Sequence, residues 1–146
     1  MKEIAKQIID CFKSGGFLFV IGNGGSSAEA GHFVAELVGR YKHERKALPA
    51  ISLTTDSAIL TAIANDYGYE KVFTRQLEAL SKKGDCLIAL STSGKSKNVL
   101  EAIKWSGTHG LKVFELKRIG TTTAEIQENH LFMLHKLAEK IEMAFL

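Results

Sequence analysis

The sequence predicts an α/β fold, a doubly wound parallel sheet of four or five strands flanked by helices in a three-layer sandwich. Apolar runs of four or five residues alternate with helical patterns along the whole chain. The run Cys86–Leu90 has no polar alternation, as expected for a strand covered on both faces in a parallel sheet. Two runs open into turns of small residues followed by a helix, and ligands of such folds bind at the carboxyl ends of the strands.

The size and composition predict one domain, residues 1–146, because 146 residues with 45% hydrophobic content form a single core. The net charge of +3 comes from lysines scattered among acidic residues, which predicts a solvated surface and no nucleic-acid partner. We find no signal-peptide pattern and no long apolar run, and expect a cytoplasmic protein without membrane contact. Cys11 and Cys86 lie in apolar patterns, so we expect reduced thiols and no cysteine-based zinc site.

The first half of the chain is expected to hold two helices and two strands. Apolar residues at helical spacing predict a helix over Met1–Lys13, which the glycines that follow would end. The apolar run Phe17–Ile21 predicts the first strand. The turn Gly22–Ser26 then leads into a helix that runs to Val38. A second strand is predicted over Ala50–Leu53, after a polar, basic loop.

The second half is expected to repeat the alternation. Helices are predicted over Ser57–Ala64 and Val72–Leu80, separated by the turn signal Asn65–Gly68. The buried strand Cys86–Leu90 comes next, then a hydroxyl-rich turn and a helix. Lys112–Leu116 is the predicted fourth strand.

Thr121–Phe145 is expected to form a long final helix that begins with the capping pattern Thr122-x-x-Glu125. Only Lys117–Gly120 separates this helix from the fourth strand. A parallel fifth strand needs a crossover of about ten residues or more, so the chain has no room for one at this point.

The glycine turn Gly22–Ser26 is a candidate phosphate site. Its glycines allow positive φ and close backbone approach, and the free N–H groups of the following helix would point at an anion. Ser26-x-x-Glu29 has the form of a capping box, so Ser26 caps the helix or binds a phosphate oxygen. The alternative is a tight strand-to-helix corner without function.

The second turn, Ser91–Ser96, offers several hydroxyl donors and backbone N–H groups at a helix start, which suit a phosphate monoester. The alternative is a cluster of helix-capping residues. Ser93-Gly94-Lys95-Ser96 is similar to the end of a nucleotide-binding P-loop. The position of the required first glycine holds Ala89, however, which argues against an ATPase.

His32 and Glu36 are four residues apart on one predicted helix, so they share a face and could bind one metal ion or one substrate. Gln127 and His135, in the last helix, are candidates to complete the site. Eight helical residues separate their backbones by about 12 Å. Either long side chains converge on the ion or the site forms at a subunit boundary.

Taken together, these motifs resemble the sugar-isomerase (SIS) domain family, most closely its phosphoheptose isomerases. The resemblance covers nearly the whole chain. It rests on Gly22–Ser26, on His32-Phe33-x-x-Glu36-Leu37-x-Gly39-Arg40-Tyr41, on Asn65–Gly68, on Ser91-Thr92-Ser93-Gly94-x-Ser96, and on Ile126-Gln127-Glu128-x-His130 with His135 beyond.

The resemblance implies a substrate site, a zinc ion in each subunit and a homotetramer with sites at subunit contacts. The residues implied to hold the phosphate are Ser26, Ser91, Thr92, Ser93 and Ser96. Those implied to line the sugar are Asn23, Gly24, Gly25, Arg40, Asn65 and Asp66, with Glu36 and Gln127 also contacting substrate. The implied zinc ligands are His32, Glu36, Gln127 and His135.

The implied activity is the interconversion of sedoheptulose 7-phosphate and D-glycero-D-manno-heptose 7-phosphate, for heptose and lipopolysaccharide precursors. Such an isomerisation proceeds through an enediol and needs a base and an acid, for which we choose Glu36 and His135. A carboxylate bound tightly to zinc is a poorer base, so the two roles of Glu36 compete. The alternative function is a non-catalytic SIS protein that binds the replication initiator, and the complete set of implied zinc ligands favours the enzyme.

The chain departs from the family pattern in its shorter N-terminal helical segment and in the missing room for a fifth strand. In addition, Glu125 stands where the isomerases often have arginine.

Overall fold

A computed structural model describes all 146 residues and has one four-stranded sheet in the order β2-β1-β3-β4. Every neighbouring pair of strands is parallel, which confirms the predicted α/β class. The strands are β1 (Leu18–Ile21), β2 (Ala50–Ser52), β3 (Cys86–Ala89) and β4 (Lys112–Glu115). No fifth strand follows β4, whose open edge leaves its residues exposed or half-buried.

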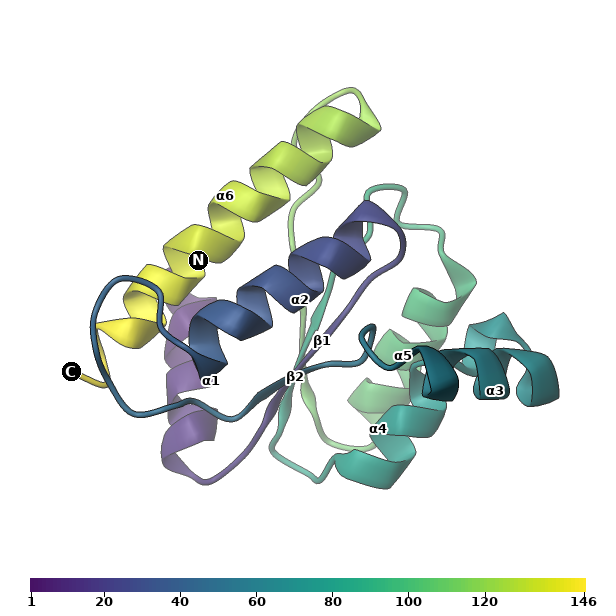
Figure 1. Cartoon of the computed structure of the whole chain (residues 1–146), viewed down its shortest axis with the longest axis horizontal. Helices are drawn as coiled ribbons and strands as arrows, with labels where there is room; N and C mark the ends of the chain where they lie inside the picture. The colour runs from purple at the N-terminus through teal and green to yellow at the C-terminus, as the bar shows by residue number, and fades with distance from the viewer.

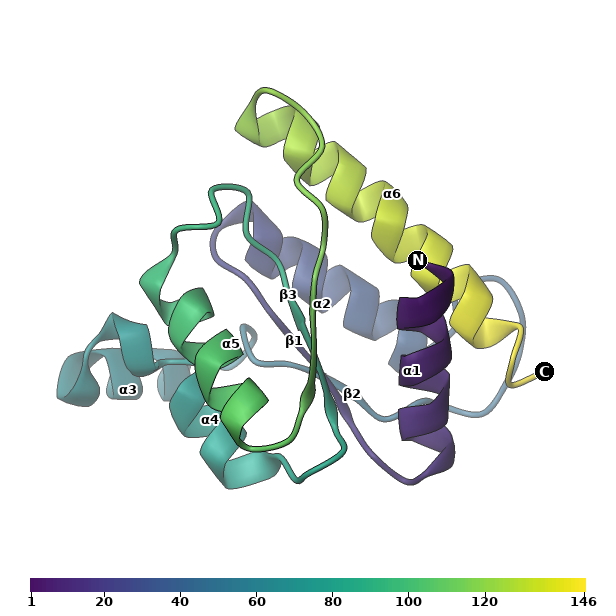
Figure 2. The same cartoon turned by 180° about the vertical axis from the view of Figure 1, so that it is seen from behind.

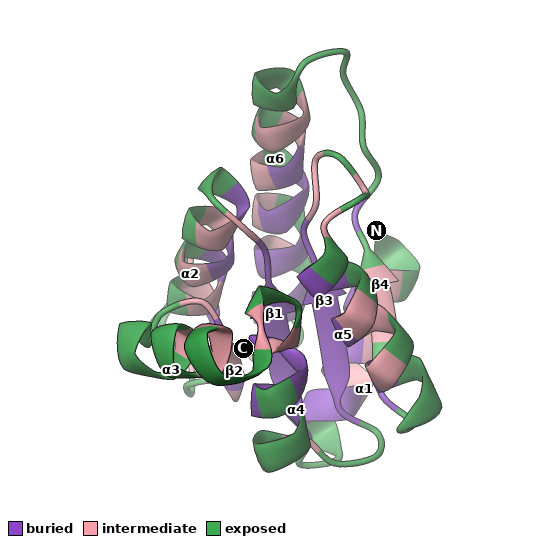
Figure 3. Cartoon of the chain, turned by 90° about the vertical axis from the view of Figure 1, so that its right-hand side faces the viewer, coloured by how far each residue is buried: buried purple, intermediate pink, exposed green.

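Helices cover both faces of the sheet (Figures 1 and 2). The helices on one face are α1 (Lys2–Lys13), α2 (Gly25–Val38) and α6 (Thr123–Glu142). The other face is covered by α4 (Thr74–Leu80) and α5 (Lys97–Thr108), with α3 (Ser57–Tyr67) and the 3-10 turn η1 (Tyr69–Lys71) at its margin. Figure 3 shows the buried strands between these layers and α3 on the outside. None of these helices combines the length and the apolar character needed to cross a membrane.

The strands divide their side chains between two cores because successive residues of a strand point to opposite faces. Leu18 and Val20 belong to the core under α1, α2 and α6, whereas Phe19 and Ile21 belong to the core under α4 and α5. All four side chains are fully buried. This two-sided burial explains why the apolar runs show no alternation with polar residues.

The predicted turn at Asn65–Gly68 is wrong over most of its length. The helix α3 continues through Asn65, Asp66 and Tyr67, and only Gly68 leaves it, with φ of +90°. Asn and Asp favour turns in general, but a glycine that adopts positive φ without strain is a stronger signal for the end of a helix. The next predicted helix also begins later than expected, at Thr74, after the η1 turn.

One of the two predicted capping boxes is wrong and the other is confirmed. Helix α2 begins at Gly25 after an N-cap at Gly24, which has φ of +56°, so Ser26 is buried inside the first turn. At the start of α6, the Thr122 hydroxyl accepts a bond from the Glu125 N–H, and the Glu125 carboxylate accepts one from the Thr122 N–H. The N-cap of α2 is therefore Gly24, not Ser26 as the sequence pattern predicted.

The loop between α2 and β2 is held by a buried ion pair from the end of α6. The Glu142 carboxylate accepts hydrogen bonds from the backbone N–H groups of Tyr41, Lys42 and His43 at 2.9, 2.9 and 3.0 Å. Arg45 Nε lies 3.8 Å from the same carboxylate, and neither side chain is exposed by more than 1%. Burial opposes ionisation of Glu142, but the three N–H groups and Arg45 outweigh it and lower its pKa.

We predict that Glu142→Gln lowers the free energy of unfolding by about 3 kcal/mol, because it leaves Arg45 as a buried charge without its partner. Chemical denaturation measures this loss. Glu139→Gln is the matched control, since Glu139 pairs with Lys42 at the surface and its loss should cost less than about 1 kcal/mol. Equal losses in the two variants would contradict the anchoring role of Glu142.

Candidate active site

The two turns proposed to hold a phosphate lie side by side at one edge of the sheet. Strands β1 and β3 pair in parallel, with Ile21 opposite Ala89 at their carboxyl ends. The turns Gly22–Ser26 and Ser91–Ser96 start just beyond these residues. The expected convergence of the two turns is confirmed.

A reciprocal pair of side-chain amides joins the first turn to helix α5. Asn23 Nδ2 donates to Asn98 Oδ1 at 2.8 Å, and Asn98 Nδ2 donates to Asn23 Oδ1 at 2.8 Å. The Tyr69 hydroxyl donates to the same Asn23 oxygen at 3.1 Å. Asn98 is buried and also accepts a bond from the Val99 N–H. Neither Asn98 nor Tyr69 belongs to a sequence motif that marks it as functional, and their contacts with Asn23 span 75 and 46 residues.

The glycine turn is packed too closely to accept side chains. A Cβ at Gly22 would lie 2.8 Å from the Ser26 Cβ, so Ser26 fits directly against the turn. A Cβ at Gly25 would collide with the amide of Gln127, which lies against the start of α2. Gln127 is therefore next to the predicted phosphate turn, at one end of the contact between α2 and α6.

Two hydroxyls of the second turn organise the turn itself. Ser91 Oγ accepts a bond from the Gly94 N–H at 3.0 Å, and Ser93 Oγ accepts one from the Lys95 N–H at 3.1 Å. Ser96 is the N-cap of α5, and its side chain forms no capping bond. Thr92, between Ser91 and Ser93, is half-buried. The turn thus has the helix start and hydroxyls expected of an anion site.

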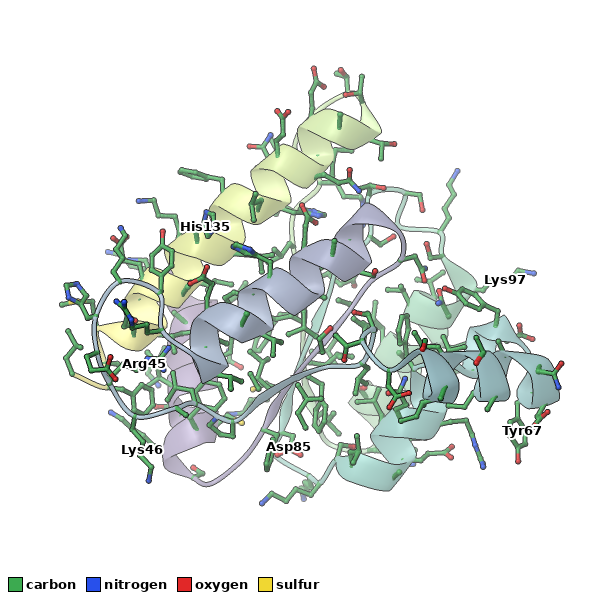
Figure 4. All side chains as sticks on the ribbon, in the orientation of Figure 1. Arg45, Lys46, Tyr67, Asp85, Lys97 and His135 are labelled. Atoms are coloured by element: carbon green, nitrogen blue, oxygen red, sulfur yellow. The ribbon has the colours of Figure 1, made fainter.

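The imidazole and carboxylate cluster forms where α6 faces α2. His32 Nε2 lies 2.9 Å from His135 Nε2 and 3.3 Å from Glu36 Oε1. Figure 4 shows His135 on α6 at this contact. The ring of Tyr41 stacks on His135 with centroids 5.5 Å apart, and Tyr41 is itself held by Glu142. Glu142 therefore acts on the His135 imidazole indirectly, by holding the backbone of Tyr41.

The donor set of this cluster fits a metal ion. One ligand atom each from His32, Glu36 and His135 lies within 4.8 Å of the others. Two imidazoles and a carboxylate are typical zinc ligands, and three protein ligands leave a position open for substrate. Gln127 is not part of this group, since its amide lies against Gly25, two helical turns of α6 before His135.

Three predicted sugar-binding residues lie on the surface of the single chain. Asn65 Nδ2 donates to Asp66 Oδ1 at 2.8 Å, and both residues are exposed near the end of α3. Arg40 is exposed, and its Nε lies 4.0 Å from Glu44 Oε2. The single chain does not bring these residues into contact with the imidazole cluster.

Glu29 is a polar residue of α2 that sequence analysis treated only as part of a cap. It is half-buried, and its Oε2 atom is buried without a hydrogen-bond partner. Burial raises the pKa of Glu29 from 4.5 to about 7. Its position three residues before His32 and seven before Glu36, on the same helix face, was the available signal.

The fold and these clusters define the class of protein. The profile of the SIS domain family matches residues 1–117, and the chain belongs to that family, among its phosphoheptose isomerases. It is 48% identical over 160 residues to the phosphoheptose isomerase of Campylobacter concisus (strain 13826), covering 98% of this chain and 85% of that protein. For the phosphoheptose isomerase of Helicobacter pylori (strain P12), the identity is 47%, with 99% and 84% covered.

Solved structures support the same assignment. The phosphoheptose isomerase from Francisella tularensis superimposes with a TM-score of 0.93 at 34% identity, covering 97% of this chain and 84% of that one. The phosphoheptose isomerase from Neisseria gonorrhoeae gives 0.89 at 35% identity, with the same coverage. The alignment of 160 residues with the Campylobacter protein exceeds the 146 residues of this chain, so gaps are present, and the family match ends at Lys117.

We predict that Asn98→Ala destabilises the protein by about 1 to 3 kcal/mol, because it removes two hydrogen bonds and leaves the Nδ2 group of the half-buried Asn23 without its acceptor. Chemical denaturation tests this. Asn129→Ala is the control, since the half-buried Asn129 donates to two backbone carbonyls in a solvent-accessible region where water can replace its bonds, so the expected loss is below about 1 kcal/mol. A loss for Asn98→Ala no larger than the control would show that the amide pair is not an anchor.

Glu29 should make the protein less stable as the pH rises. Between pH 4.5 and about 7 the folded state retains a proton that the unfolded state has released, so the free energy of unfolding falls across this window. Glu29→Gln, with a neutral side chain of the same size, should lack this fall. Denaturation of both proteins at pH 5 and pH 8 measures the difference, and Glu78→Gln controls for loss of a surface carboxylate. Parallel pH profiles for wild type and Glu29→Gln would contradict the prediction.

Proposed function

We propose that this chain interconverts sedoheptulose 7-phosphate and D-glycero-D-manno-heptose 7-phosphate, and that it supplies heptose for lipopolysaccharide precursors. The observation that carries the proposal is the placement of both clusters along α2. The helix begins at the glycine turn, and His32 lies seven residues later, about 10 Å along its axis. An extended seven-carbon sugar phosphate can span that distance. The phosphoheptose isomerase relatives favour this enzyme over a non-catalytic protein that binds a replication initiator.

The two turns would hold the substrate by its phosphate and its hydroxyl groups. The proposed phosphate ligands are Ser26, Ser91, Thr92, Ser93 and Ser96. The proposed sugar ligands are Asn23, Gly24, Gly25, Arg40, Asn65, Asp66 and Gln127. The paired amides of Asn23 and Asn98 and the hydroxyl bonds within the second turn support this assignment, because they preorganise the polar groups before substrate binds.

The reaction moves a proton between C1 and C2 of the sugar. In the direction from ketose to aldose, Glu36 removes a proton from C1 while His135 donates one to the C2 oxygen, which forms an enediol. The C1 hydroxyl then returns a proton to His135, and protonated Glu36 delivers its proton to C2. The stacking of Tyr41 on His135 supports the role of the imidazole by fixing its orientation.

We further propose one zinc ion per subunit, held by His32, Glu36 and His135, with Gln127 joining only if its side chain leaves Gly25. Bound zinc would act as a Lewis acid on the sugar carbonyl. Glu36 cannot be a tightly bound ligand and a strong base at once. The half-buried carboxylate of Glu36 lies 3.3 Å from His32, close enough to interact with this imidazole in either role.

The proposed assembly is a homotetramer in the cytoplasm. Helix α3 has no buried residue, although it carries large apolar side chains. Ile59 is 41% exposed and Tyr67 is 54% exposed. An interface with another subunit would cover this apolar area and bring a partner surface toward Asn65 and Asp66. The two buried cysteines are free thiols, which suits a reducing compartment. Sedimentation should give a mass near four times 16.0 kDa, and a monomer would contradict this proposal.

Turnover of sedoheptulose 7-phosphate by the purified protein, assayed before and after chelation and with zinc added back, tests the function. We expect conversion to the heptose phosphate and a loss of activity on chelation that zinc restores. No conversion under any metal condition would contradict the proposed reaction.

Glu36→Gln tests the base. We expect kcat to fall by about a hundredfold or more, because removal of a general base costs about 10² to 10⁴ in rate, while the substrate still binds. The control is Glu78→Gln, on the surface of α4, which should keep full activity. A near-normal kcat for Glu36→Gln would exclude Glu36 as the base.

A further inference from the structure

The short segment between β4 and α6 places an arginine against the second turn. Residues Lys117–Gly120 pass beside the turn Ser91–Ser96 on their way to α6 (Figures 2 and 3). A Cβ at Gly94 would lie 2.8 Å from both Cζ and Nη1 of Arg118 and 3.2 Å from its Nη2. The Arg118 guanidinium therefore occupies the space that the missing side chain of Gly94 leaves open, at the middle of the hydroxyl turn.

Arg118 is the one arginine of the chain that has no acidic partner. Arg40, Arg45 and Arg75 each lie within 4.0 Å of a glutamate. No carboxylate lies that close to Arg118, nor to Lys95 in the same turn. Arg118 donates no hydrogen bond to the protein either, so its five N–H donors are available to a ligand.

We propose that Arg118 binds the phosphate of the substrate and so selects for sugars with a terminal phosphate. This inference rests on the proposed function, in which the second turn holds that phosphate. Hydroxyls and backbone N–H groups donate hydrogen bonds to a phosphate but carry no net charge. A guanidinium adds a charged, bidentate donor that matches two phosphate oxygens. Gly94 has two roles. It adopts the positive φ of +66° that the turn needs, and its lack of a side chain leaves space for the guanidinium.

Arg118 lies just beyond the part of the chain that the family profile matches. The family match ends at Lys117, one residue earlier, and the direct route from β4 to α6 carries Arg118 past the turn. A longer connection at this point would not need to follow the same path.

The test compares Arg118→Gln with Lys117→Gln. Both residues are exposed, adjacent and cationic, but the atoms nearest to a Cβ at Gly94 all belong to Arg118. We expect Arg118→Gln to raise KM for sedoheptulose 7-phosphate about tenfold or more with kcat changed less than about twofold, because the phosphate is remote from the reacting carbons and is bound equally in ground and transition states. Lys117→Gln should leave both constants near the wild-type values. Arg118→Lys keeps the positive charge but lacks the planar bidentate donors of the guanidinium. It should therefore bind the substrate more tightly than Arg118→Gln and less tightly than the wild type.

A binding measurement separates this inference from the proposed reaction. Inorganic phosphate, titrated into each protein by calorimetry, should bind wild type and Lys117→Gln alike and bind Arg118→Gln about tenfold more weakly. Equal phosphate affinity for Arg118→Gln and Lys117→Gln would overturn the role of Arg118, whether or not the wild type turns over the heptose phosphate. A lower kcat with unchanged KM would also overturn it. Failure of wild-type turnover with the expected phosphate binding would reject the reaction and keep the anion site.

Discussion

The parallel pairing of β1 with β3 is the constraint on which the site depends. It sets the carboxyl ends of the two strands side by side, so that two turns far apart in the sequence open at one edge of the sheet. The Asn23 and Asn98 amides then join these turns through two hydrogen bonds that leave neither amide unpaired. Buried polar groups must find partners, and here the requirement also fixes the distance between the two halves of the proposed anion site.

Helix α2 connects the glycine turn to the imidazole and carboxylate cluster and so fixes the position of one relative to the other. Its first turn packs on the glycine turn, and its later turns carry His32 and Glu36 to the contact with α6. The far end of α6 fixes the same contact, because Glu142 captures the backbone of the loop that presents Tyr41 to His135. Two helices and one buried carboxylate therefore hold the cluster from opposite sides. A geometry fixed in this way lowers the cost of orienting substrate and catalytic groups.

The short connection between β4 and α6 affects the electrostatics of the site. With no crossover after β4, the chain returns to α6 by a direct path and brings a guanidinium against a turn that already contains four hydroxyl side chains and Lys95. Between the glycine turn and His32 on α2, burial of Glu29 raises its pKa to about 7. Positive charge is thus found at the end proposed for the phosphate, and a protonatable carboxyl group lies on α2 between that end and the imidazole cluster.

The sequence by itself determined the order of helices and strands, the parallel class of the sheet, the two small-residue turns and the pair His32 and Glu36. These features follow from local periodicity and short spacing, which the chain expresses without its tertiary contacts. It also determined that no crossover for a fifth strand exists, since that depends only on the length of Lys117–Gly120. The sequence did not determine the helix ends, because Asn65–Gly68 contains several turn-forming residues and only the glycine ends the helix.

Only the tertiary structure decided which distant residues meet. The pairing of Asn98 with Asn23, the burial of Glu29, the capture of the loop by Glu142 and the contact of Arg118 with Gly94 join segments that no periodicity connects. It likewise placed Gln127 against Gly25 and apart from His135, because two turns of a rigid helix separate them. Such contacts arise from packing α6 on α2 and from the path of the chain around the sheet, and neither is encoded in a local run of residues.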